Sequence, residues 1–548
     1  MENRKNNILI PSATIVPEEL QKLGKLPAII YPVNQNIVFD YLLEQYKDKY
    51  DKMRIICHEQ ADKVHRRLEK YKKDDVEILD LPVLDDLGHT IYFGLEGINR
   101  PTIINFADTI VLDDALLDYD DAYYYTEDFI SDTWTYFDQE NGMITTIYDK
   151  NAMDSEEKAK LFVGVFKISD PQFFRKCLEN AFENRSKEIS TFYCALKMYS
   201  EQYPMSMLET DDWFDIGHAD KYYDSKLAVK AREFNHITID KNRGILKKVS
   251  DDKEKFIGEI KWYLKLPMDV EYVRPRIFSY STSYNNPYVE MEYYSYHTVH
   301  ELFLYGDLSR TQWRELFQRI QFVCHDFKRY SVSDDQIRPA LEDMYLTKTK
   351  QRFEKMKQND NFKNFFKNEI SVNGKKYQSL ESIMKLLEVE IPNMLYDVDE
   401  FHIIHGDLCF ANIMIDTNLS FIKVIDPRGK FGKFDIYGDV RYELAKLLHS
   451  VDGKYDFIIK DMFHVAYNVD DATITYSIID RKRNFDLYEL FVEVFAEEIA
   501  GDIKKIEFIE ALLFLSMIPL HGESLQHQMV MLGTGLEILN RVINIEKR

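Results

Sequence analysis

A short polar segment in the last third of the chain constrains its fold and chemistry more than any other feature. His405, Asp407 and Asn412 lie close together, and Asp426 follows at the end of the apolar run 421–425. Phosphoryl transfer needs a carboxylate near the acceptor hydroxyl and oxygen ligands that hold Mg²⁺ on the phosphates. The segment supplies both kinds of group at the ends of strand-like runs, so its spacing indicates a phosphoryl-transfer site.

This segment resembles the catalytic and metal-binding loops of the aminoglycoside phosphotransferase and choline kinase family, relatives of the protein kinases. The resemblance implies that Asp407 is the catalytic base or the residue that orients the acceptor hydroxyl, and that His405 braces the loop. It also implies that Asn412 and Asp426 bind Mg²⁺ beside ATP. Helical periodicity dominates from Val299 onward, so we expect residues 299–548 to form the larger lobe of this fold.

A kinase of this kind also needs a cation against the α- and β-phosphates, supplied by a strand and held by a helix glutamate. The runs 236–240 and 245–249 flank a turn and predict an antiparallel hairpin. Side chains alternate along a strand, so Lys247 and Lys248 point to opposite faces and only one can face the nucleotide. We favour Lys248, with Glu259 as its partner, and Lys247 is the alternative.

Glu290 and Glu292 belong to an edge-like run, 288–293, that follows the helix carrying Glu259. By its position, this run is interpreted as the hinge that joins the two lobes and offers backbone hydrogen bonds to a purine. The smaller kinase lobe is therefore expected at residues 233–298.

The first 232 residues are organised differently. Strand-like runs such as 8–10, 54–57 and 76–79 alternate with helix-like stretches such as 37–50. This rhythm predicts an α/β domain with a mostly parallel sheet and helices on both faces.

The order of these elements is similar to that of the sugar-phosphate nucleotidyltransferases, which implies a Rossmann-like (GT-A-like) domain. Asp108, in the run 105–109, and Asp215, in the run 213–217, occupy places where that family binds the metal that activates a nucleoside triphosphate. Where the family has a Gly-x-Gly-Thr-Arg loop, this chain has Pro11–Pro17, without glycine or arginine and with prolines that lack amide donors. We expect a degenerate domain that binds a sugar or product or acts as a scaffold; an active nucleotidyltransferase with altered recognition is the alternative.

The net charge and the cysteine content limit the binding partners and metal sites that we expect for this chain. With 70 basic and 93 acidic residues the net charge is −23, so electrostatic binding to nucleic acid is not expected. The five cysteines are far apart and predict neither disulfides nor a zinc site.

The longest apolar run, 511–520, is about half the ~18 residues of a membrane span, and the N-terminus lacks the pattern of a signal peptide. We expect a cytoplasmic protein without membrane insertion, and its oligomeric state stays open.

These features predict an α/β plus α+β protein in which a two-lobed phosphotransferase moves the γ-phosphoryl group of ATP, with Mg²⁺, to a hydroxyl of a small metabolite. Amino alcohols related to choline or ethanolamine and sugars are the candidate acceptors, and the acidic composition favours a cationic one. By analogy with tandem enzymes, the product would serve bacterial surface polysaccharide or headgroup biosynthesis. Two alternatives stay open: an enzyme with both domains active, and a non-catalytic binding platform of the pseudokinase type.

Overall fold

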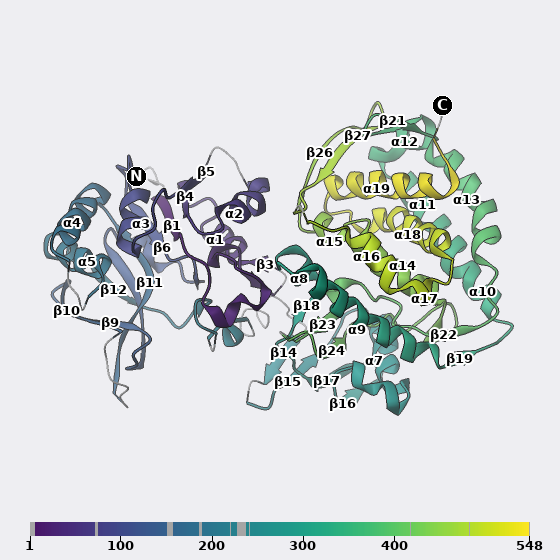
Figure 1. Cartoon of the computed structure of the whole chain (residues 1–548), viewed down its shortest axis with the longest axis horizontal. Helices are drawn as coiled ribbons and strands as arrows, with labels where there is room; N and C mark the ends of the chain where they lie inside the picture. Colours follow the sequence, from purple (N-terminus) through teal and green to yellow (C-terminus); the bar gives the residue numbers. More distant parts are fainter. Residues whose placement is uncertain are drawn as a thin grey trace. The chain divides into compact units, whose positions relative to one another are not determined.

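The structure is a computed structural model, and Figure 1 shows the whole chain. The residues that it describes are 6–34, 36–71, 75–150, 157–185, 189–219, 221–226, 237–240, 242–416, 418–481 and 483–546. The chain divides into two compact units, Met1–Lys230 and Ala231–Arg548. The expected domain boundary at residues 232 and 233, and the expected strand residue His236, lie outside the described residues.

A nine-stranded sheet forms the centre of the first unit, with the path β10-β9-β11-β6-β1-β4-β5 and with β8 and β12 joined to it through β11. The strands are β1 (Asn6–Ser12), β4 (Tyr50–Cys57), β5 (Val76–Asp80), β6 (Thr102–Asn105), β8 (Ala122–Phe129), β9 (Thr135–Glu140), β10 (Met143–Asp149), β11 (Lys158–Ile168) and β12 (Ser206–Glu209). A separate two-stranded sheet pairs β7 (Thr109–Val111) with β13 (Trp213–Asp215), and β2 (Pro32–Val33) pairs with β3 (Asn36–Ile37).

The prediction of a mostly parallel sheet is wrong, because the sheet is mixed. β6, β1, β4 and β5 are parallel to one another. β11 runs antiparallel to β6, β8 and β9. A parallel connection needs a long crossover, usually a helix. Between β6 and β11 the chain forms β7–β10 instead of an α-helix, so β11 enters the sheet in the opposite direction.

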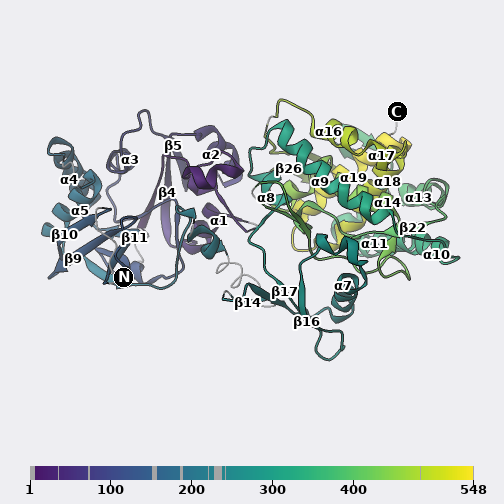
Figure 2. The ribbon, with the colours of Figure 1, turned by 60° about the horizontal axis from the view of Figure 1, so that its bottom comes forward.

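Helices cover both faces of this sheet, as the sequence predicts; Figures 1 and 2 show α4 and α5 on one side and α1 and α2 on the other. They are α1 (Val38–Gln45), α2 (Ala61–Arg67), α3 (Leu87–Gly94), α4 (Pro171–Glu183) and α5 (Thr191–Gln202). Pro171 is the first residue of α4, and the carboxylate of Asp170 caps the helix by accepting from the Phe173 amide, a favoured helix start. α1 is shorter than the expected 37–50: it ends at Gln45, and a turn in which Asp48 has a φ of +62° leads into β4 at Tyr50.

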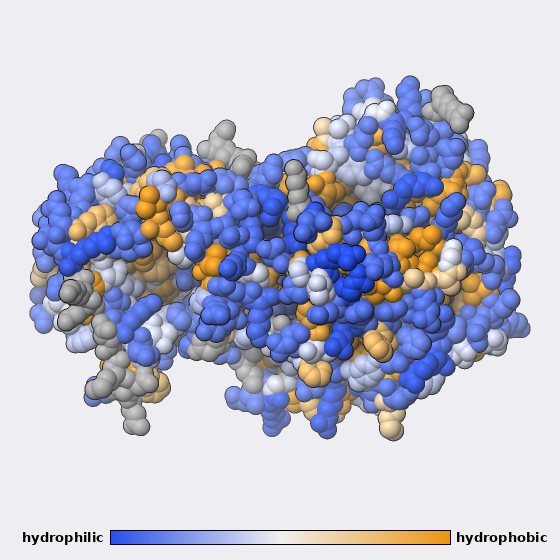
Figure 3. All heavy atoms as spheres, viewed as in Figure 1, coloured by the Kyte–Doolittle hydropathy of each residue, from blue (hydrophilic) through white to orange (hydrophobic). Residues whose placement is uncertain are grey.

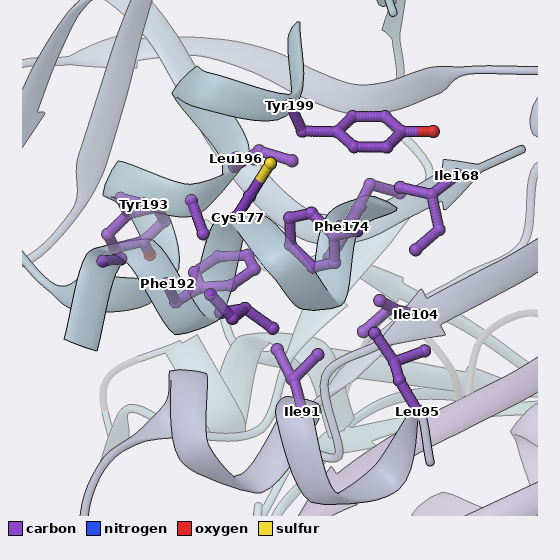
Figure 4. Close-up of a cluster of buried hydrophobic side chains, with 14 of the residues drawn as sticks. Ile91, Leu95, Ile104, Ile168, Phe174, Cys177, Phe192, Tyr193, Leu196 and Tyr199 are labelled. Carbon is purple, nitrogen blue, oxygen red and sulfur yellow. The ribbon is translucent and has the colours of Figure 1, made fainter. Parts of the chain in front are cut away.

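The main core of the first unit lies between the sheet and α3, α4 and α5. Ile91 and Leu95 from the α3 region, Phe174 from α4 and Phe192 from α5 pack together with strand residues such as Ile104 (Figure 4). All five side chains are fully buried. Burial of such side chains contributes about 1.5–3 kcal/mol each, so this face of the sheet holds the helices firmly in place.

The second unit begins with a four-stranded antiparallel sheet of order β14-β15-β17-β16. Its strands are β14 (Ile237–Asp240), β15 (Ile245–Lys248), β16 (Ile277–Ser281) and β17 (Tyr288–Glu292), and the helix α7 (Lys253–Lys265) follows β15 in the chain. β14 and β15 form the predicted hairpin, with Ile237 opposite Lys248. The prediction that residues 288–293 form an edge is wrong, because β17 is flanked by β15 and β16.

The remainder of the second unit is mainly helical. Its α-helices are α8 (Val299–Leu304), α9 (Arg310–Lys328), α10 (Ile337–Leu341), α11 (Lys348–Lys357), α12 (Lys363–Lys367), α13 (Leu380–Leu395), α14 (Val440–Val451), α15 (Tyr455–Ile458), α16 (Leu487–Val494), α17 (Ala496–Ile499), α18 (Ile503–Met517) and α19 (Leu525–Ile543). α18 packs against α14 and α19, as Figure 1 shows. The apolar run 511–520 falls in α18 and the short turn after it, and its residues up to Ile518 are almost all buried, because they face neighbouring helices.

Short strands position the loops of this helical part. One sheet has the order β18-β23-β24 and another the order β19-β22-β25. These strands are β18 (His297–Thr298), β19 (Ser331–Val332), β22 (Phe401–Ile403), β23 (Ile413–Ile415), β24 (Ile422–Val424) and β25 (Tyr437–Gly438). A further sheet, β21-β20-β27-β26, is not predicted by the sequence pattern; it comprises β20 (Ile370–Val372), β21 (Lys375–Tyr377), β26 (Phe463–Asn468) and β27 (Thr473–Ile478).

The face drawn in Figure 3 is largely hydrophilic, with scattered hydrophobic patches. This agrees with the charged residues that make up 30% of the chain. Among the described residues, no helix combines the length and the apolar character that crossing a bilayer requires.

Candidate functional site

The polar loop of the second unit lies between β22 and β23. The side-chain amide of Asn412 donates to the backbone oxygen of Asp407 over 2.8 Å and to its carboxylate over 3.2 Å. The Cys409 amide also donates to the Asp407 carbonyl, and the Asn412 amide to the Cys409 carbonyl. The loop is therefore a tight turn that holds Asp407 and Asn412 side by side, and it leaves the carbonyl oxygen of the Asn412 side chain as an acceptor for another partner.

His405 lies beneath this loop and is fully buried. Its Nε2 is 2.9 Å from the carbonyl oxygen of Ile425, while the Arg428 amide donates to the His405 carbonyl. Burial lowers the pKa of the imidazole to about 4, so the ring is neutral near pH 7. His405 thus ties the loop to the segment that carries Asp426, and it has no charge to offer to a reaction.

Asp426 follows β24 and has a backbone φ of +57°. Its amide donates to the hydroxyl of Tyr263 on α7 over 3.0 Å, and its carboxylate is half exposed. A left-handed conformation is uncommon for a residue other than glycine, although aspartate tolerates it better than most. The turn directs the carboxylate out of the strand toward Lys248.

Lys248 on β15 and Glu259 on α7 meet at the same place. The Lys248 ammonium lies 2.8 Å from Glu259 Oε1 and 2.7 Å from Asp426 Oδ1. Burial opposes the charged form of Lys248, but the two carboxylates outweigh it and hold the pKa of the lysine above its usual value. Burial, followed by the charge of Asp426, raises the pKa of Glu259 to about 7. One ammonium group is therefore shared by two carboxylates.

Lys247 lies on the other face of β15, where its ammonium is 3.1 Å from Glu290 Oε1 and over the ring of Tyr288. The structure brings Lys248, and not Lys247, together with Glu259 and Asp426.

Glu290 and Glu292 are not placed as a free hinge. Glu290 pairs with Lys247 on one side and with Ser279 on the other. The Glu292 amide donates to the carbonyl of Arg276, and its carboxylate accepts from the Tyr294 hydroxyl. Both edges of β17 are occupied by neighbouring strands, and the hydrogen bonds of these residues to a purine stay a prediction. The connection between β17 and β18 is formed by residues 293–296 instead.

Lys446 is a site residue that the sequence pattern does not reveal. It comes from α14, and its ammonium lies 2.8 Å from Asp407 Oδ1 with little exposure of the side chain. Burial acts to raise the pKa of Asp407, but the Lys446 ammonium prevails and the pKa lies far below the usual range. On the same helix, Glu443 accepts from the Gly406 amide over 2.9 Å. α14 therefore fixes both the backbone and the charge of the loop.

The donor set fits Mg²⁺. Asp426 offers a carboxylate and Asn412 a carbonyl oxygen, and hard divalent cations take oxygen ligands. Lys248 supplies a positive charge next to the same carboxylate. The second unit thus brings together the Asp407 carboxylate, two oxygen donors that suit a divalent cation and the ammonium of Lys248.

In the first unit, the pairing of β7 with β13 brings Asp108 and Asp215 together. A Cβ atom on Gly217 would lie 2.5 Å from the carboxylate of Asp108, while the Gly217 amide donates to Asp215. Burial, followed by the charge of Asp215, raises the pKa of Asp108 to about 6. His218, which the sequence pattern does not single out, places its Nδ1 2.7 Å from the second oxygen of Asp215.

The segment where a triphosphate-binding loop is expected is already engaged within the first unit. Pro11 and Ser12 continue β1 and pair with β4. The amide of Ile15 donates to the carboxylate of Glu59 over 3.0 Å. Because the Glu59 carboxylate already occupies this amide, the amide is not free to face a phosphate, as the amides of a phosphate-binding loop are.

Solved structures of nucleotidyltransferases resemble the N-terminal part of the chain. A nucleoside-diphosphate-sugar pyrophosphorylase from Vibrio cholerae matches with 13% identity and a TM-score of 0.32, over 40% of this chain and 99% of its own. A CTP:phosphocholine cytidylyltransferase from Streptococcus pneumoniae matches with 16% identity and a TM-score of 0.33, over 41% and 99% of the two chains. A glucose-1-phosphate thymidylyltransferase from Bacillus anthracis, so described provisionally, matches with 13% identity and a TM-score of 0.34, over 42% and 96%.

Neither a family model nor a curated protein matches the chain. At these identities and TM-scores, activity has to be argued from the chain's own residues.

Proposed function

We propose that the second unit is a kinase that transfers the γ-phosphoryl group of ATP to a hydroxyl of a small metabolite. The observation that carries this proposal is the meeting of Lys248, Glu259 and Asp426 from three separate elements, next to the loop that holds Asp407 and Asn412. These are the residues that the kinase resemblance predicts. Their convergence also argues against a non-catalytic platform.

In this proposal the acceptor oxygen bonds to the γ-phosphorus while the bond from that phosphorus to the bridging oxygen of ADP breaks. ADP leaves, and the hydroxyl proton passes to solvent. Lys446 keeps Asp407 ionised, so Asp407 acts mainly by accepting a hydrogen bond from the hydroxyl and orienting it. Bound Mg²⁺ would be held by Asn412 and Asp426 and would neutralise charge on the phosphates.

The matched lysines of β15 test the nucleotide site. Lys248→Met leaves two carboxylates facing each other, and we expect the KM for ATP to rise at least about tenfold, which corresponds to roughly 1.4 kcal/mol. Lys247→Met removes only a contact with Glu290 on the other face and should change the KM less than about twofold. Mg²⁺-dependent ADP release over a panel of hydroxyl acceptors is the measurement. A larger loss in Lys247→Met, or no turnover with any acceptor, would contradict the proposal.

For the first unit we propose a degenerate nucleotidyltransferase-like domain that binds a sugar or product or serves as a scaffold. The strand pairing of Pro11 and Ser12 and the carboxylate of Glu59 on the Ile15 amide support this reading. The alternative of an active nucleotidyltransferase is favoured by the proximity of Asp108 and Asp215. It predicts pyrophosphate release from a nucleoside triphosphate, which we do not expect.

Asp108→Asn is expected to stabilise the first unit at neutral pH in the presence of EDTA. A carboxyl whose folded pKa is raised contributes stability below its unfolded value of about 4, and that contribution is lost as the pH rises through about 6. The variant should therefore unfold at a temperature a few degrees higher at pH 7.5 and at the same temperature at pH 4, as measured by thermal denaturation. A variant that is less stable at both pH values would show that the Asp108 carboxylate has a structural partner.

The product of such a kinase would belong to sugar or headgroup activation for a bacterial surface polysaccharide. This part of the proposal rests on the tandem arrangement of the two units.

A further inference from the structure

Asp407 and Asp426 line a cavity of about 1100 Å³. Its walls come from α7, from Tyr284 in the turn between β16 and β17, from α11 and the turn before it, from residues 426–435, from α14 and from α18. Among the described residues, none from β15 or β17 contributes to the lining. The cavity is therefore on the side where an acceptor, rather than the purine of ATP, can reach Asp407.

The charge of this cavity differs from that of the whole chain. Eight of its lining residues are lysine or arginine and five are aspartate or glutamate, whereas the chain as a whole has a net charge of −23. Three of the five carboxylates are already paired with a lysine: Asp407 with Lys446, Asp426 with Lys248 and Asp435 with Lys265. The positive charge of the cavity is thus in excess.

Four of the cations form one wall beside Asp407: Lys348 and Arg352 of α11, and Arg428 and Lys430 of the segment after Asp426. Within the part of the chain that the structure describes, Arg352 and Lys430 have no carboxylate within ion-pair distance. The guanidinium of Arg428 bonds to the hydroxyl of Tyr442, and the closest carboxylate to the Lys348 ammonium is that of Asp343 at 4.0 Å.

These cations interact unfavourably with one another. Burial, followed by the charge of Arg428, lowers the pKa of Lys348 to about 8; Asp343 opposes this by less than Arg428 contributes, and Lys430 and Arg352 add smaller lowering effects. The charged form of a lysine in these surroundings is stabilised when an anion binds nearby. A positively charged ammonium acceptor, by contrast, would add another like charge.

We propose that this wall, defined by Lys348, Arg352, Arg428 and Lys430, binds an anionic group of the acceptor, a phosphate or a carboxylate. The inference rests on the proposed kinase function and narrows its acceptor to hydroxyl compounds that also carry a negative charge. It replaces the expectation of a cationic acceptor, which follows from the net charge of the chain and not from this cavity. α18, which packs against α11, adds apolar residues such as Leu512 and Met517 to the lining, and these have no charge to hold an ionic group.

The first test is binding of inorganic phosphate to the full chain, with Mg²⁺ and a non-hydrolysable ATP analogue present to fill the nucleotide site. Calorimetry should show saturable binding that weakens at least tenfold in the double variant Lys348→Gln/Arg352→Gln. Each single variant should lose part of the affinity, and Lys357→Gln, exposed at the end of α11 about half a helical turn away from Lys348, should lose none. Absent binding by the natural chain, or equal binding by the double variant, overturns the proposal.

The second test compares acceptors in ADP release: glycerol 3-phosphate and glycerate against glycerol, ethanolamine and choline. We expect the anionic compounds to be turned over at lower KM, with KM rising in the double variant while the KM for ATP stays within about twofold. Faster turnover of choline or ethanolamine overturns the anionic acceptor and leaves the kinase standing. Phosphate binding that depends on Lys348 and Arg352, without ADP release from any acceptor, supports the anion site and contradicts the kinase.

Discussion

Asp407→Asn is expected to lower the rate of phosphoryl transfer by about 10²–10⁴-fold, the range in which a positioned acid–base or orienting group acts. The asparagine keeps the shape of the side chain and its contact with Asn412, but it removes the negative charge that accepts the hydroxyl hydrogen. The effect should fall on kcat, while the KM for ATP changes little, because Lys248 and Asp426 remain in place. Steady-state ADP release is the measurement.

A matched double variant separates this effect from a loss of stability. Asp407→Asn leaves the Lys446 ammonium buried without its carboxylate, and an uncompensated buried charge is strongly destabilising. Asp407→Asn/Lys446→Met should regain stability in thermal denaturation without regaining activity. Asp399→Asn, on an exposed loop before β22, is the control for both measurements. Recovery of activity in the double variant would show that Asp407 serves only to neutralise Lys446.

The local part of this site could be predicted from the sequence, because Asp407, Asn412 and Asp426 belong to one loop and the strand that returns to it. Because side chains alternate along β15, the sequence also predicts that Lys247 and Lys248 point to opposite faces. Only the packing of α7 shows that Lys248 is the one that meets Glu259. Lys446 could not be found in this way, since it reaches Asp407 from a helix with no spacing rule that links the two residues. The same applies to the cationic wall, whose members come from two distant segments.

The errors in the predicted fold have a common physical origin. Residues 288–293 carry an alternating pattern typical of an edge strand, but the position of a strand in its sheet depends on partners such as β16, which pairs with it across a turn. β11 is likewise apolar enough for a parallel core strand, and its direction is decided by the strands inserted between β6 and β11. Short strands such as β20 and β21 contain too few residues for a periodicity to be recognised.

Gly429→Ala is expected to disrupt the site formed by Lys248, Glu259 and Asp426, although Gly429 has no side chain that could take part in it. Gly429 has a φ of +66°, and a Cβ atom there would lie 2.2 Å from the carbonyl carbon and oxygen of Gly258 and 2.7 Å from the amide of Glu259. These are backbone atoms of α7, so the clash cannot be relieved by turning a side chain. α7 would have to move, and with it Glu259, which holds Lys248. We expect a lower thermal midpoint, a higher KM for ATP and a fall in kcat of at least tenfold.

Gly244 offers a matched control because its φ of +63° imposes the same backbone strain, while a Cβ atom there has no neighbour within 4 Å. Alanine in this conformation costs about 1–2 kcal/mol at either position, so Gly244→Ala reports the strain alone. The excess loss in Gly429→Ala then measures the close approach between α7 and the segment after Asp426. Equal losses of stability and activity in the two variants would show that this contact does not hold Glu259 in the site. A loss of ATP affinity that is larger in Gly429→Ala than in Gly244→Ala would show that nucleotide binding depends on the position of α7. Gly429 itself contributes no atom to the ion pairs, so the effect would have to act through α7.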